Sequence, residues 1–282
     1  MSVRIIVDSS SDLPKSVIEH YDFTIIPLSV HFGEEEYLDA INITSSQFYD
    51  KLKSSEIMPT TSQIPPERFI EYIQPELDAG HDVVVVTLGS NASGTCQSAH
   101  IAKSELGSDK ITIIDSNALC LGTAYVAVEA AELILSGTKP EDLAQALKPF
   151  TDNGIEHLFC VDTLEYLRKG GRIKASKAMV AEILNIKPIL NVEDAITQTI
   201  YKVRGRKKII PYYIDKIKKE MDPDNRRIFV GHAQDEAFAR KLITSLEEEL
   251  EWSGEIILGE IGATIGSHAG PGVLACFYKK KS

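Results

Sequence analysis

The sequence is poor in cysteine. Only four cysteines occur among 282 residues, at positions 96, 120, 160 and 276, and no Cys-x-x-Cys pair exists. This spacing argues against a zinc site and against a thiol redox motif, because both need closely spaced cysteines. We therefore expect no metal site, and four cysteines that are buried, reduced and chemically passive.

Long hydrophobic runs are also lacking. The most apolar long segment, Ala118–Leu135, contains Glu129 and Glu132, so it predicts a mostly buried helix rather than a membrane span. The first apolar run of the chain is short and ends at Asp8, unlike the hydrophobic region of a signal peptide. We expect a cytoplasmic protein without a transmembrane segment.

Basic residues are scarce in the first half of the chain. Residues 1–152 contain 9 Lys and Arg against 23 Asp and Glu, a net charge of −14. Residues 153–282 contain 21 against 18, a net charge of +3, with a basic cluster over Lys202–Lys208. The overall charge of −11 argues against a nucleic acid partner. The composition shift indicates a domain boundary near residues 150–160, and the cluster is either a solvated face or a docking surface for an acidic partner.

Four consecutive valines dominate the most informative stretch of the sequence. Val83–Val86 indicate a strand buried on both faces, which is typical of a parallel sheet covered by helices. A loop of small polar residues follows, and then a helix over Cys96–Leu106 that Gly107 ends. Similar strand and helix patterns alternate over residues 1–155. We predict an α/β fold whose N-terminal domain is doubly wound (Rossmann-like) around a mainly parallel sheet.

Local signals define the other elements of this first domain. Thr44–Gln47 forms a capping box, and Pro66 suits the first turn of a helix. The further predicted strands are Arg4–Val7, Thr24–Val30 and Lys110–Ile114, and the predicted helices are Ser45–Lys53, Pro66–Leu77, Leu119–Leu135 and Pro140–Phe150.

The pattern changes in residues 156–282. A strand that alternates from Ala195 to Val203 indicates an antiparallel hairpin turning at Glu193 and Asp194. The predicted helices here are Ser176–Leu184, Ile209–Met221 and Asp235–Leu250. We predict a smaller C-terminal α+β domain with a largely antiparallel sheet.

Polar loops follow several of the predicted strands. Ser90, Ser93 and Thr95 come after the valine strand, and Thr60–Ser62 lies in a loop stiffened by prolines. Because ligands of open α/β sheets bind at the carboxyl ends of the strands, these hydroxyls are candidate ligand contacts. The alternative is a helix cap that satisfies only its own backbone.

A glycine-rich loop is predicted over residues 262–272, with four glycines around His268. Glycine at this density lets the backbone approach a ligand or another domain closely. His268 is therefore a candidate binding residue, although a lone histidine is more often structural. Gly270–Ala275 matches Gly-x-Gly-x-x-Ala, but too little chain follows for a dinucleotide-binding unit, so this interpretation is rejected.

Taken together and in order, these motifs resemble the DegV family. The segments that carry the resemblance are Asp8–Asp12, Thr60–Ser62, Ser93–Thr95, Ser98–Ala99, Asp115–Ser116, Leu167–Arg172, Arg204 and Ile265–Gly272. They span essentially the whole chain. The sequence departs from the family pattern at Gly89–Ser93, where Ser-x-x-Leu-Ser is commoner, and at Leu274–Cys276, where a glycine is frequent. Both departures concern the shape of the pocket near the head group.

The resemblance implies a function. Members of the family are bacterial cytoplasmic proteins whose two α/β domains bind one long-chain fatty acid between them. It implies a non-catalytic role like that of the fatty-acid-binding subunit of bacterial fatty acid kinase, which presents the carboxylate to a separate ATP-binding kinase subunit. The acyl phosphate then passes to an acyltransferase at the membrane surface for phospholipid synthesis. No catalytic residue, metal or cofactor is implied beyond the bound fatty acid.

The resemblance also assigns residues to these roles. The implied contacts of the fatty-acid carboxylate are Thr61, Ser62, Ser93, Gly94, Thr95 and His268. The residues implied in head-group binding or partner docking are Arg172, Arg204 and Arg206. This chemistry is suitable in itself, because hydroxyls and an imidazole hold a carboxylate without the fixed geometry of a bidentate arginine.

Other functions could use the same residues. A serine hydrolase would combine Ser93 with His268, but Asn91 replaces the first glycine of the Gly-x-Ser-x-Gly elbow. A kinase acting alone would need a nucleotide site, and the sequence contains no phosphate-binding loop. A lipid-responsive regulatory protein would share the site and differ only in its partner.

Overall fold

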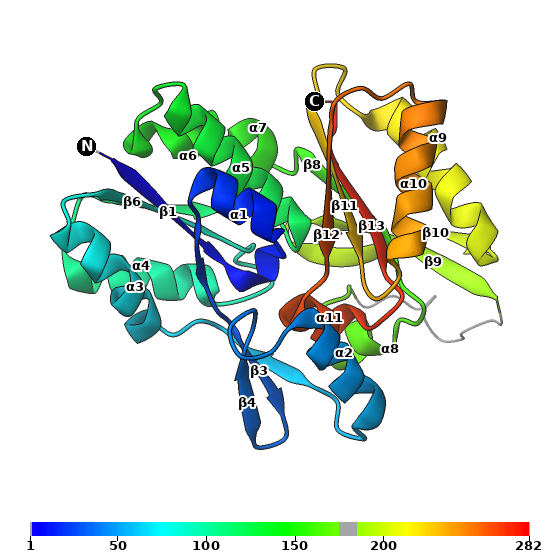
Figure 1. The fold of residues 1–282 in the computed structure, drawn as a ribbon, viewed down its shortest axis with the longest axis horizontal. Coiled ribbons are helices and arrows are strands. Elements are labelled where there is room, and N and C mark those ends of the chain that lie inside the picture. Colours follow the sequence, from blue (N-terminus) through cyan, green and yellow to red (C-terminus); the bar gives the residue numbers. More distant parts are fainter. Residues whose placement is uncertain (1, 175–184, 282) are drawn as a thin grey trace.

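The structure is a computed structural model that describes residues 2–174 and 185–281. Figure 1 shows two lobes side by side, each built around a sheet, with a smaller group of strands and helices beneath them. The helix predicted at Ser176–Leu184 lies outside the described residues.

The first lobe contains a four-stranded parallel sheet. The strands, in spatial order, are β2 (Thr24–Ile26), β1 (Val3–Asp8), β6 (Asp82–Thr87) and β7 (Ile111–Asp115). Val83 and Val85 pack toward one layer of helices, and Val84 and Val86 pack toward the other. The layers, visible in Figure 1, are formed by α3 (Pro66–Asp78) with α4 (Thr95–Leu106) and by α1 (Lys15–Tyr21) with α5 (Leu121–Leu135). The predicted doubly wound arrangement is therefore confirmed.

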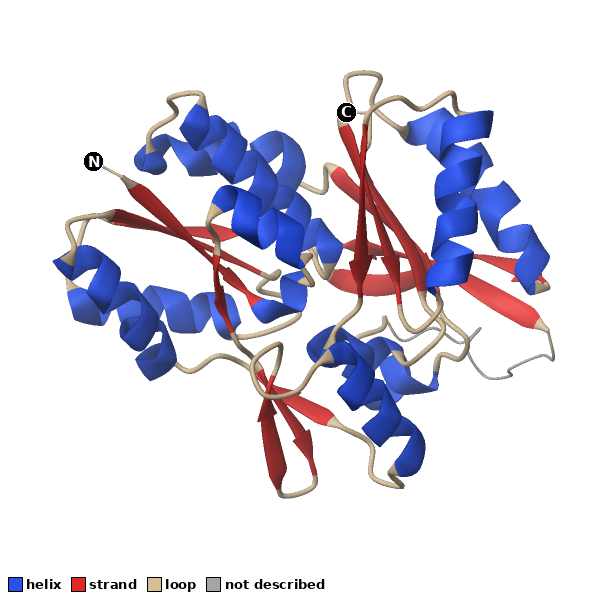
Figure 2. Ribbon diagram, viewed as in Figure 1, coloured by secondary structure: helices blue, strands red, loops and turns tan. Residues whose placement is uncertain are grey.

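The second lobe contains a six-stranded sheet. Its strands, in spatial order, are β10 (Ile196–Arg204), β9 (Ile186–Glu193), β8 (Ile155–Cys160), β13 (Leu274–Lys279), β11 (Arg227–His232) and β12 (Glu255–Glu260). Neighbouring strands are antiparallel except β11 and β12. Helices α9 (Ile209–Glu220) and α10 (Glu236–Glu249) cover one face, as Figure 2 shows. The largely antiparallel sheet is confirmed, with the hairpin turn one residue later than predicted, at Asp194 and Ala195.

The segment Thr24–Val30 does not form the single strand that was predicted, and part of it belongs to a third sheet of three strands. That segment is divided between two sheets, because β2 ends at Ile26 and β3 (Ser29–Phe32) begins after Pro27. Proline has no N–H group to continue a ladder. The strand β3 pairs with β4 (Glu35–Leu38) and with β5 (Thr60–Ser62), so the predicted loop at residues 60–62 is a strand.

The predicted helix over Pro140–Phe150 is also wrong. This segment forms three short pieces, η2 (Pro140–Asp142), α6 (Leu143–Ala146) and α7 (Lys148–Thr151). Pro149 explains the break between α6 and α7, because it has no N–H group to bond the preceding turn. The shorter elements elsewhere are η1 (Ser9–Ser11), α2 (Ser45–Ser54), α8 (Glu165–Lys169) and η4 (Arg206–Lys208), and α2 begins at the predicted capping box.

The glycine-rich loop predicted over residues 262–272 contains a helix, α11 (Ala263–Ala269). Its first N–H groups are bound by two carboxylates that are distant in sequence. The N–H of Gly262 donates to Asp12 Oδ1 at 2.8 Å, and those of Ala263 and Thr264 donate to the two oxygens of Asp39 at 3.2 Å. Capping from outside lets a helix form where local propensity is low.

The helix α5 joins the two lobes. Its residues from Leu121 to Ala131 are buried between the first sheet and the second. One apolar core includes Val84 and Val86 of β6 together with Phe229 of β11 and Phe277 of β13. The division into domains 1–155 and 156–282 stays a prediction. Within the described residues, no helix is long and apolar enough to cross a membrane.

Candidate ligand-binding site

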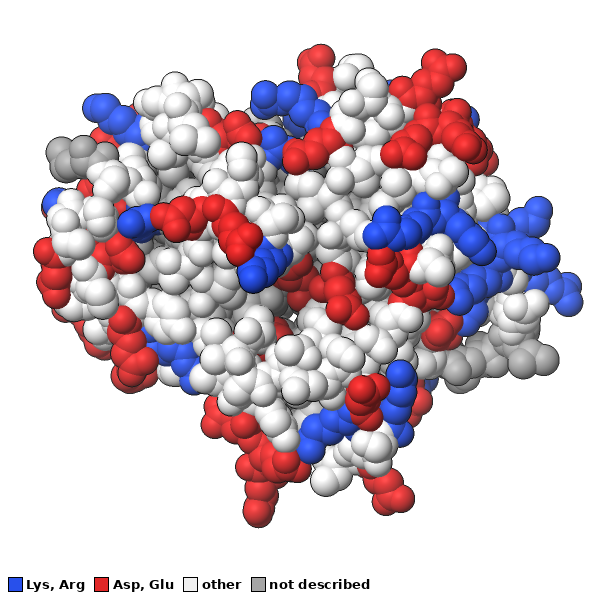
Figure 3. Space-filling model, viewed as in Figure 1, with Lys and Arg blue, Asp and Glu red and all other residues white. Residues whose placement is uncertain are grey.

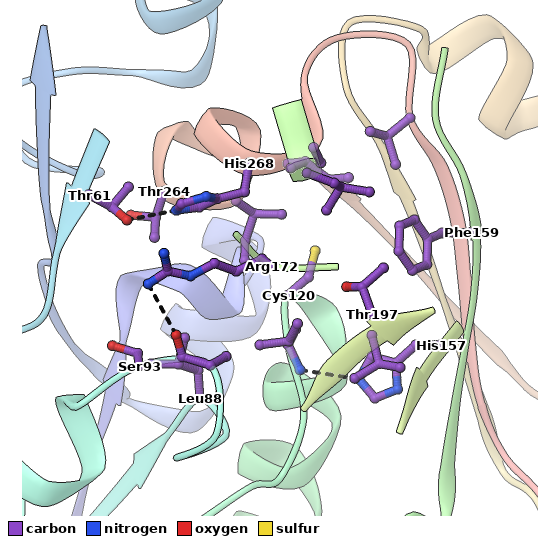
Figure 4. Close-up of a pocket in the computed structure, with 18 of the residues that line it drawn as sticks. Thr61, Leu88, Ser93, Cys120, His157, Phe159, Arg172, Thr197, Thr264 and His268 are labelled. Atoms are coloured by element: carbon purple, nitrogen blue, oxygen red, sulfur yellow. Dashed lines mark hydrogen bonds between the residues drawn. The ribbon is translucent and has the colours of Figure 1, made fainter. Parts of the chain in front are cut away.

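A cavity lies between the two lobes and the third sheet (Figure 4). It encloses about 840 Å³ of empty space, its open mouth included. Polar side chains lie at one end, and the remaining wall is largely apolar. The apolar side chains include Leu28, Leu88, Leu119, Phe159, Val192, Ile261, Val273 and Phe277.

Thr61 and His268 meet at the polar end of the cavity. Strand β5 carries Thr61 and helix α11 carries His268, and Thr61 Oγ1 lies 2.7 Å from His268 Nε2. Burial, and secondarily the charge of Arg172, lowers the pKa of His268 to about 4. The imidazole is therefore neutral at pH 7. Its buried Nδ1 has no hydrogen-bond partner among the described residues.

Ser93 lines the cavity, whereas Gly94 and Thr95 support it from behind. Ser93 Oγ accepts from the N–H of Thr95 at 3.3 Å and lies 3.0 Å from Thr95 Oγ1. Thr95 is fully buried and also accepts from the N–H of Ile64 at 3.3 Å. A Cβ at Gly94 would lie 2.0 Å from Gln63 Oε1, so a larger residue there would displace that side chain. The hydroxyl exposed to a ligand is that of Ser93.

Ser62 lines the mouth of the cavity, but its side chain is already hydrogen bonded. Ser62 Oγ lies 2.9 Å from His31 Nε2, and the residue is exposed. Because Ser62 is exposed whereas Thr61 and Ser93 are half-buried, Ser62 offers a weaker contact to a buried carboxylate than either of them.

Arg172 spans the two lobes at the same end of the cavity, as Figure 4 shows. One terminal nitrogen donates to the carbonyl of Gly170 at 2.7 Å, and the other donates to the carbonyl of Ala92 at 3.3 Å. Among the described residues, no carboxylate lies within ion-pair distance of this guanidinium. Its charge is therefore available to an anionic head group.

Arg204 and Arg206 do not line the cavity. Arg204 is an exposed residue at the end of β10, and Arg206 begins η4. Arg206 pairs with Asp235 and stacks over the Phe238 ring, with its guanidinium carbon 4.2 Å from the ring centre. Figure 3 shows Lys and Arg side chains gathered on this side of the second lobe, at the right of the view. Both arginines are therefore exposed and lie outside the cavity, and their role in partner docking stays a prediction.

His157 lies at the inner, apolar end of the cavity. Its Nε2 accepts from the N–H of Leu119 at 3.2 Å, and Nδ1 lies 3.2 Å from the carbonyl oxygen of Ile155. These partners require a neutral ring protonated at Nδ1. Burial lowers the pKa of His157 to about 4, so the inner end carries no charge at pH 7.

Cys120 adds a sulfur to the cavity wall. The four cysteines are free and buried, as predicted. Cys120 Sγ donates to Asp12 Oδ2 at 3.1 Å, and burial raises the pKa of the thiol well above its ordinary value. The thiol is therefore not a nucleophile at neutral pH.

The apolar wall of the cavity was missed from the sequence. Phe277 and Ala275 on β13, and Phe159 on β8, are ordinary core residues by type and spacing. Strand alternation places Ala275 and Phe277 on one face, but it does not tell whether that face meets a ligand or a helix. Ala275 belongs to the segment that departs from the family pattern, and it does line the cavity.

The arrangement favours binding over hydrolysis. His268 is paired with Thr61 rather than with Ser93, and its lowered pKa makes it a poor general base. Among the described residues, no group of His, Cys, Asp or Glu could hold a metal ion. The site instead combines neutral hydrogen-bonding groups, the guanidinium of Arg172 and a largely apolar wall.

Comparison with known proteins identifies the relatives of this chain. The family model described as "Uncharacterised protein, DegV family" matches residues 2–281. The chain belongs to the DegV family. A DegV domain-containing protein of Clostridium perfringens is 35% identical over 277 residues, covering 98% of both chains.

Solved DegV-family structures share the whole fold. A DegV-family protein from Thermus thermophilus, described by its fatty acid binding, has a TM-score of 0.89 at 28% identity and covers 99% of this chain and 100% of its own. DegV from Bacillus subtilis, described as a fatty acid binding protein, has a TM-score of 0.85 at 32% identity with 100% of both chains covered.

Proposed function

We propose that this DegV-family protein is a carrier of a long-chain fatty acid. The carboxylate lies against Thr61, Ser93 and His268, and the acyl chain lies along the apolar wall of the cavity. The observation that carries this proposal is the cavity between the lobes, with hydrogen-bonding groups at one end and apolar side chains beyond them. The solved relatives described as fatty-acid binding support it, because they share 28% and 32% of their residues with this chain.

The acyl chain supplies most of the affinity. Each buried methylene contributes roughly 0.8 kcal/mol, so about fourteen contribute ~11 kcal/mol before the costs of association and ordering. His157 and His268 are both neutral at pH 7, so neither imidazole adds a charge to the cavity wall. The polar end then fixes the orientation of the ligand.

The polar end suits a carboxylate that must react. Hydroxyls and a neutral imidazole hold the carboxylate through hydrogen bonds without engaging both oxygens in an ion pair. We propose that a separate ATP-binding kinase subunit phosphorylates this carboxylate, with Arg172 at the head group and Arg204 and Arg206 in partner docking. The acyl phosphate would pass to an acyltransferase at the membrane surface for phospholipid synthesis, with the carrier working in the cytoplasm.

The direct test is the identification of a copurifying lipid. Native mass spectrometry of the purified protein, followed by organic extraction, is expected to reveal one fatty acid per chain. Added palmitate or oleate is expected to raise the melting temperature of delipidated protein, because a ligand that binds only the folded state stabilises it. Absence of any acyl chain together with an unchanged melting temperature would refute the carrier function.

A hydrolase control separates the main competing function. The purified protein is expected to release no fatty acid from a p-nitrophenyl acyl ester. Turnover that disappears in Ser93→Ala would favour the serine hydrolase instead.

A further inference from the structure

Three carboxyl groups of the first lobe lie directly behind the wall of the cavity. Asp8 ends β1, Asp12 follows η1, and Asp39 follows β4. Asp8 and Asp39 are buried, and Asp12 is half-buried. We call these three residues the carboxyl triad. The proposed fatty-acid contacts include none of them, so their role needs a separate explanation.

Two members of the triad each hold a residue of the cavity wall. Asp8 Oδ2 accepts from the N–H of Leu88 at 2.6 Å, in the loop that continues to Ser93. Asp12 Oδ2 accepts from Cys120 Sγ at 3.1 Å, at the start of α5. Leu88 and Cys120 both line the cavity. The contacts therefore fix the cavity wall from its outer side.

Asp39 holds two further parts of the wall. Its Oδ2 accepts from Thr264 Oγ1 at 2.5 Å, on α11. The same oxygen accepts from Ser9 Oγ at 3.2 Å, and Ser9 Oγ in turn accepts from the N–H of Leu28 at 3.1 Å. Thr264 and Leu28 line the cavity as well. Figure 4 labels the three wall residues that bond the triad directly, and they come from three separate segments of the chain.

No positive charge balances the triad within the described part of the chain. No Lys, Arg or His there lies within ion-pair distance of any of the three carboxyl groups. The titratable groups that face the triad are all acidic, namely Tyr49 of α2, Cys96 of α4, Cys120 and Glu260 of β12. Three buried negative charges without a cation repel one another, so the folded protein gains by holding a proton on one of them.

Asp12 is the member best suited to hold this proton. Asp8 accepts three hydrogen bonds and Asp39 accepts four, which stabilise their ionised forms. Asp12 accepts only two, one of them from a thiol, which is a weak donor. Burial, followed by the charge of Asp39, raises the pKa of Asp12 well above its ordinary value, whereas the pKa of Asp8 rises to about 6.

Solvent can supply the proton without passing through the cavity. Asp12 and Asp39 line a separate hollow of about 820 Å³, its open mouth included. None of the described residues that line this hollow lines the cavity.

We infer that the carboxyl triad is a positioning network for the fatty-acid site, held together by a proton on Asp12. This inference rests on the proposed carrier function. Asp12 and Asp39 accept from the neighbouring N–H groups of Gly262 and Ala263 at the start of α11. Release of the proton to solvent leaves two like charges at this helix end, and their repulsion loosens α11 together with His268. Palmitate affinity therefore falls as the pH rises above neutral.

The test is the pH dependence of palmitate binding in the wild type and in Asp12→Asn. Titration calorimetry at constant ionic strength is expected to show that the dissociation constant of the wild type rises about fivefold between about pH 6.5 and 9.5. Asp12→Asn keeps a neutral side chain of the same shape, so its affinity should stay within about twofold of the wild-type value at pH 6.5 over the whole range. Palmitate is ionised and His268 is neutral throughout, so neither contributes to the difference.

Two further variants separate positioning from a general effect of lost charge. Asp12→Ala removes the acceptor of Gly262 and Cys120 and is expected to weaken palmitate binding about tenfold at both ends of the range. Asp222→Asn is the matched control, because Asp222 is half-buried in the second lobe and pairs with Lys279 at 2.8 Å, outside the cavity. It should change the affinity less than about twofold and keep the pH dependence of the wild type.

The outcomes distinguish this inference from the carrier function. If wild-type affinity is the same at both ends of the range, or if Asp12→Asn keeps the wild-type pH dependence, the positioning network is overturned while the carrier function stands. Wild-type affinity in Asp12→Ala would overturn it too. Asp12→Asn decides the question even where Asp12→Ala does not fold. A wild-type protein that binds palmitate at no pH would refute the carrier function itself.

Discussion

Ser93 and Ser90 lie in the same loop but have different surroundings. Ser93 lines the cavity and is half-buried, whereas Ser90 is exposed and its N–H donates to Asp115. We expect Ser93→Ala to weaken palmitate binding by about 1 kcal/mol, the value of one hydrogen bond, with little change in melting temperature. Ser90→Ala is the matched control and is expected to change neither quantity. Equal palmitate affinity in Ser93→Ala and wild type would remove this hydroxyl from the site.

His157 is expected to make the stability of the protein depend on pH. Its pKa is about 4 in the folded state and 6.5 ordinarily, so the unfolded chain binds more protons between these values. The free energy of unfolding therefore falls as the pH falls from 6.5 to 4, by about 3 kcal/mol from this group. Burial raises the pKa of Asp8 to about 6, which acts in the opposite direction over part of this window.

The contribution of His157 is isolated by comparison with His157→Gln. Urea unfolding of both proteins between pH 7 and 4.5 is expected to show a steeper decline for the wild type. Parallel curves would mean that His157 has the same pKa in the folded protein as in the unfolded chain.

The polar residues of the site could be predicted from the sequence, but its apolar wall could not. Ser93, Thr61 and His268 belong to motifs that ordinary packing does not require, so sequence alone marks them as candidates. Phe159 and Phe277 have the spacing of any buried strand residue. Only the packing of the two lobes determines that these side chains face a cavity.

At the scale of elements, α11 depends on contacts that lie far away in the sequence. Asp39 accepts hydrogen bonds from the N–H groups of Ala263 and Thr264, across a separation of more than 220 residues. Thr264 Oγ1 donates to the same carboxylate at 2.5 Å. A glycine-rich segment read locally predicts a loop, because these capping groups are not in the segment.

Asp39 is therefore expected to position His268. Asp39→Ala leaves two N–H groups and one hydroxyl of α11 without their acceptor, and we expect a loss of about 1–3 kcal/mol in unfolding free energy. Palmitate affinity should fall as well, because α11 carries His268 to Thr61. Asp39→Asn keeps one acceptor oxygen and should restore part of both losses.

The control for Asp39 is Asp50→Ala on α2. Asp50 is exposed, and the ion pair that it forms with Lys53 is long, at 3.9 Å. Its removal should change stability by less than about 0.5 kcal/mol. Full palmitate affinity in folded Asp39→Ala would show that α11 keeps His268 in place without this cap.

At the scale of the whole molecule, the two lobes meet along α5 and share an apolar core. The sequence patterns predicted the two larger sheets, but they contained no information on how these sheets face each other. The charge asymmetry of the sequence does survive in the fold, because the basic cluster at residues 202–208 lies on the outer side of the second lobe (Figure 3). The ligand end and the basic end of this lobe are therefore separate surfaces.

This separation leads to a prediction for Arg204 and Arg206. Arg204 is exposed and lies outside the cavity, so Arg204→Ala should change the melting temperature and palmitate affinity little. Its charge can steer an acidic partner, so the rate of phosphorylation by the kinase subunit should fall, more strongly at low salt than at high salt. Arg206 is already paired with Asp235 and stacked on Phe238, so Arg206→Ala should reduce that rate less. Palmitate is titrated into each variant, and each loaded variant is titrated into the kinase subunit, so that ligand binding and docking are measured separately. A large loss of palmitate affinity in Arg204→Ala with unchanged coupling to the kinase subunit would place Arg204 in ligand binding and contradict its role in docking.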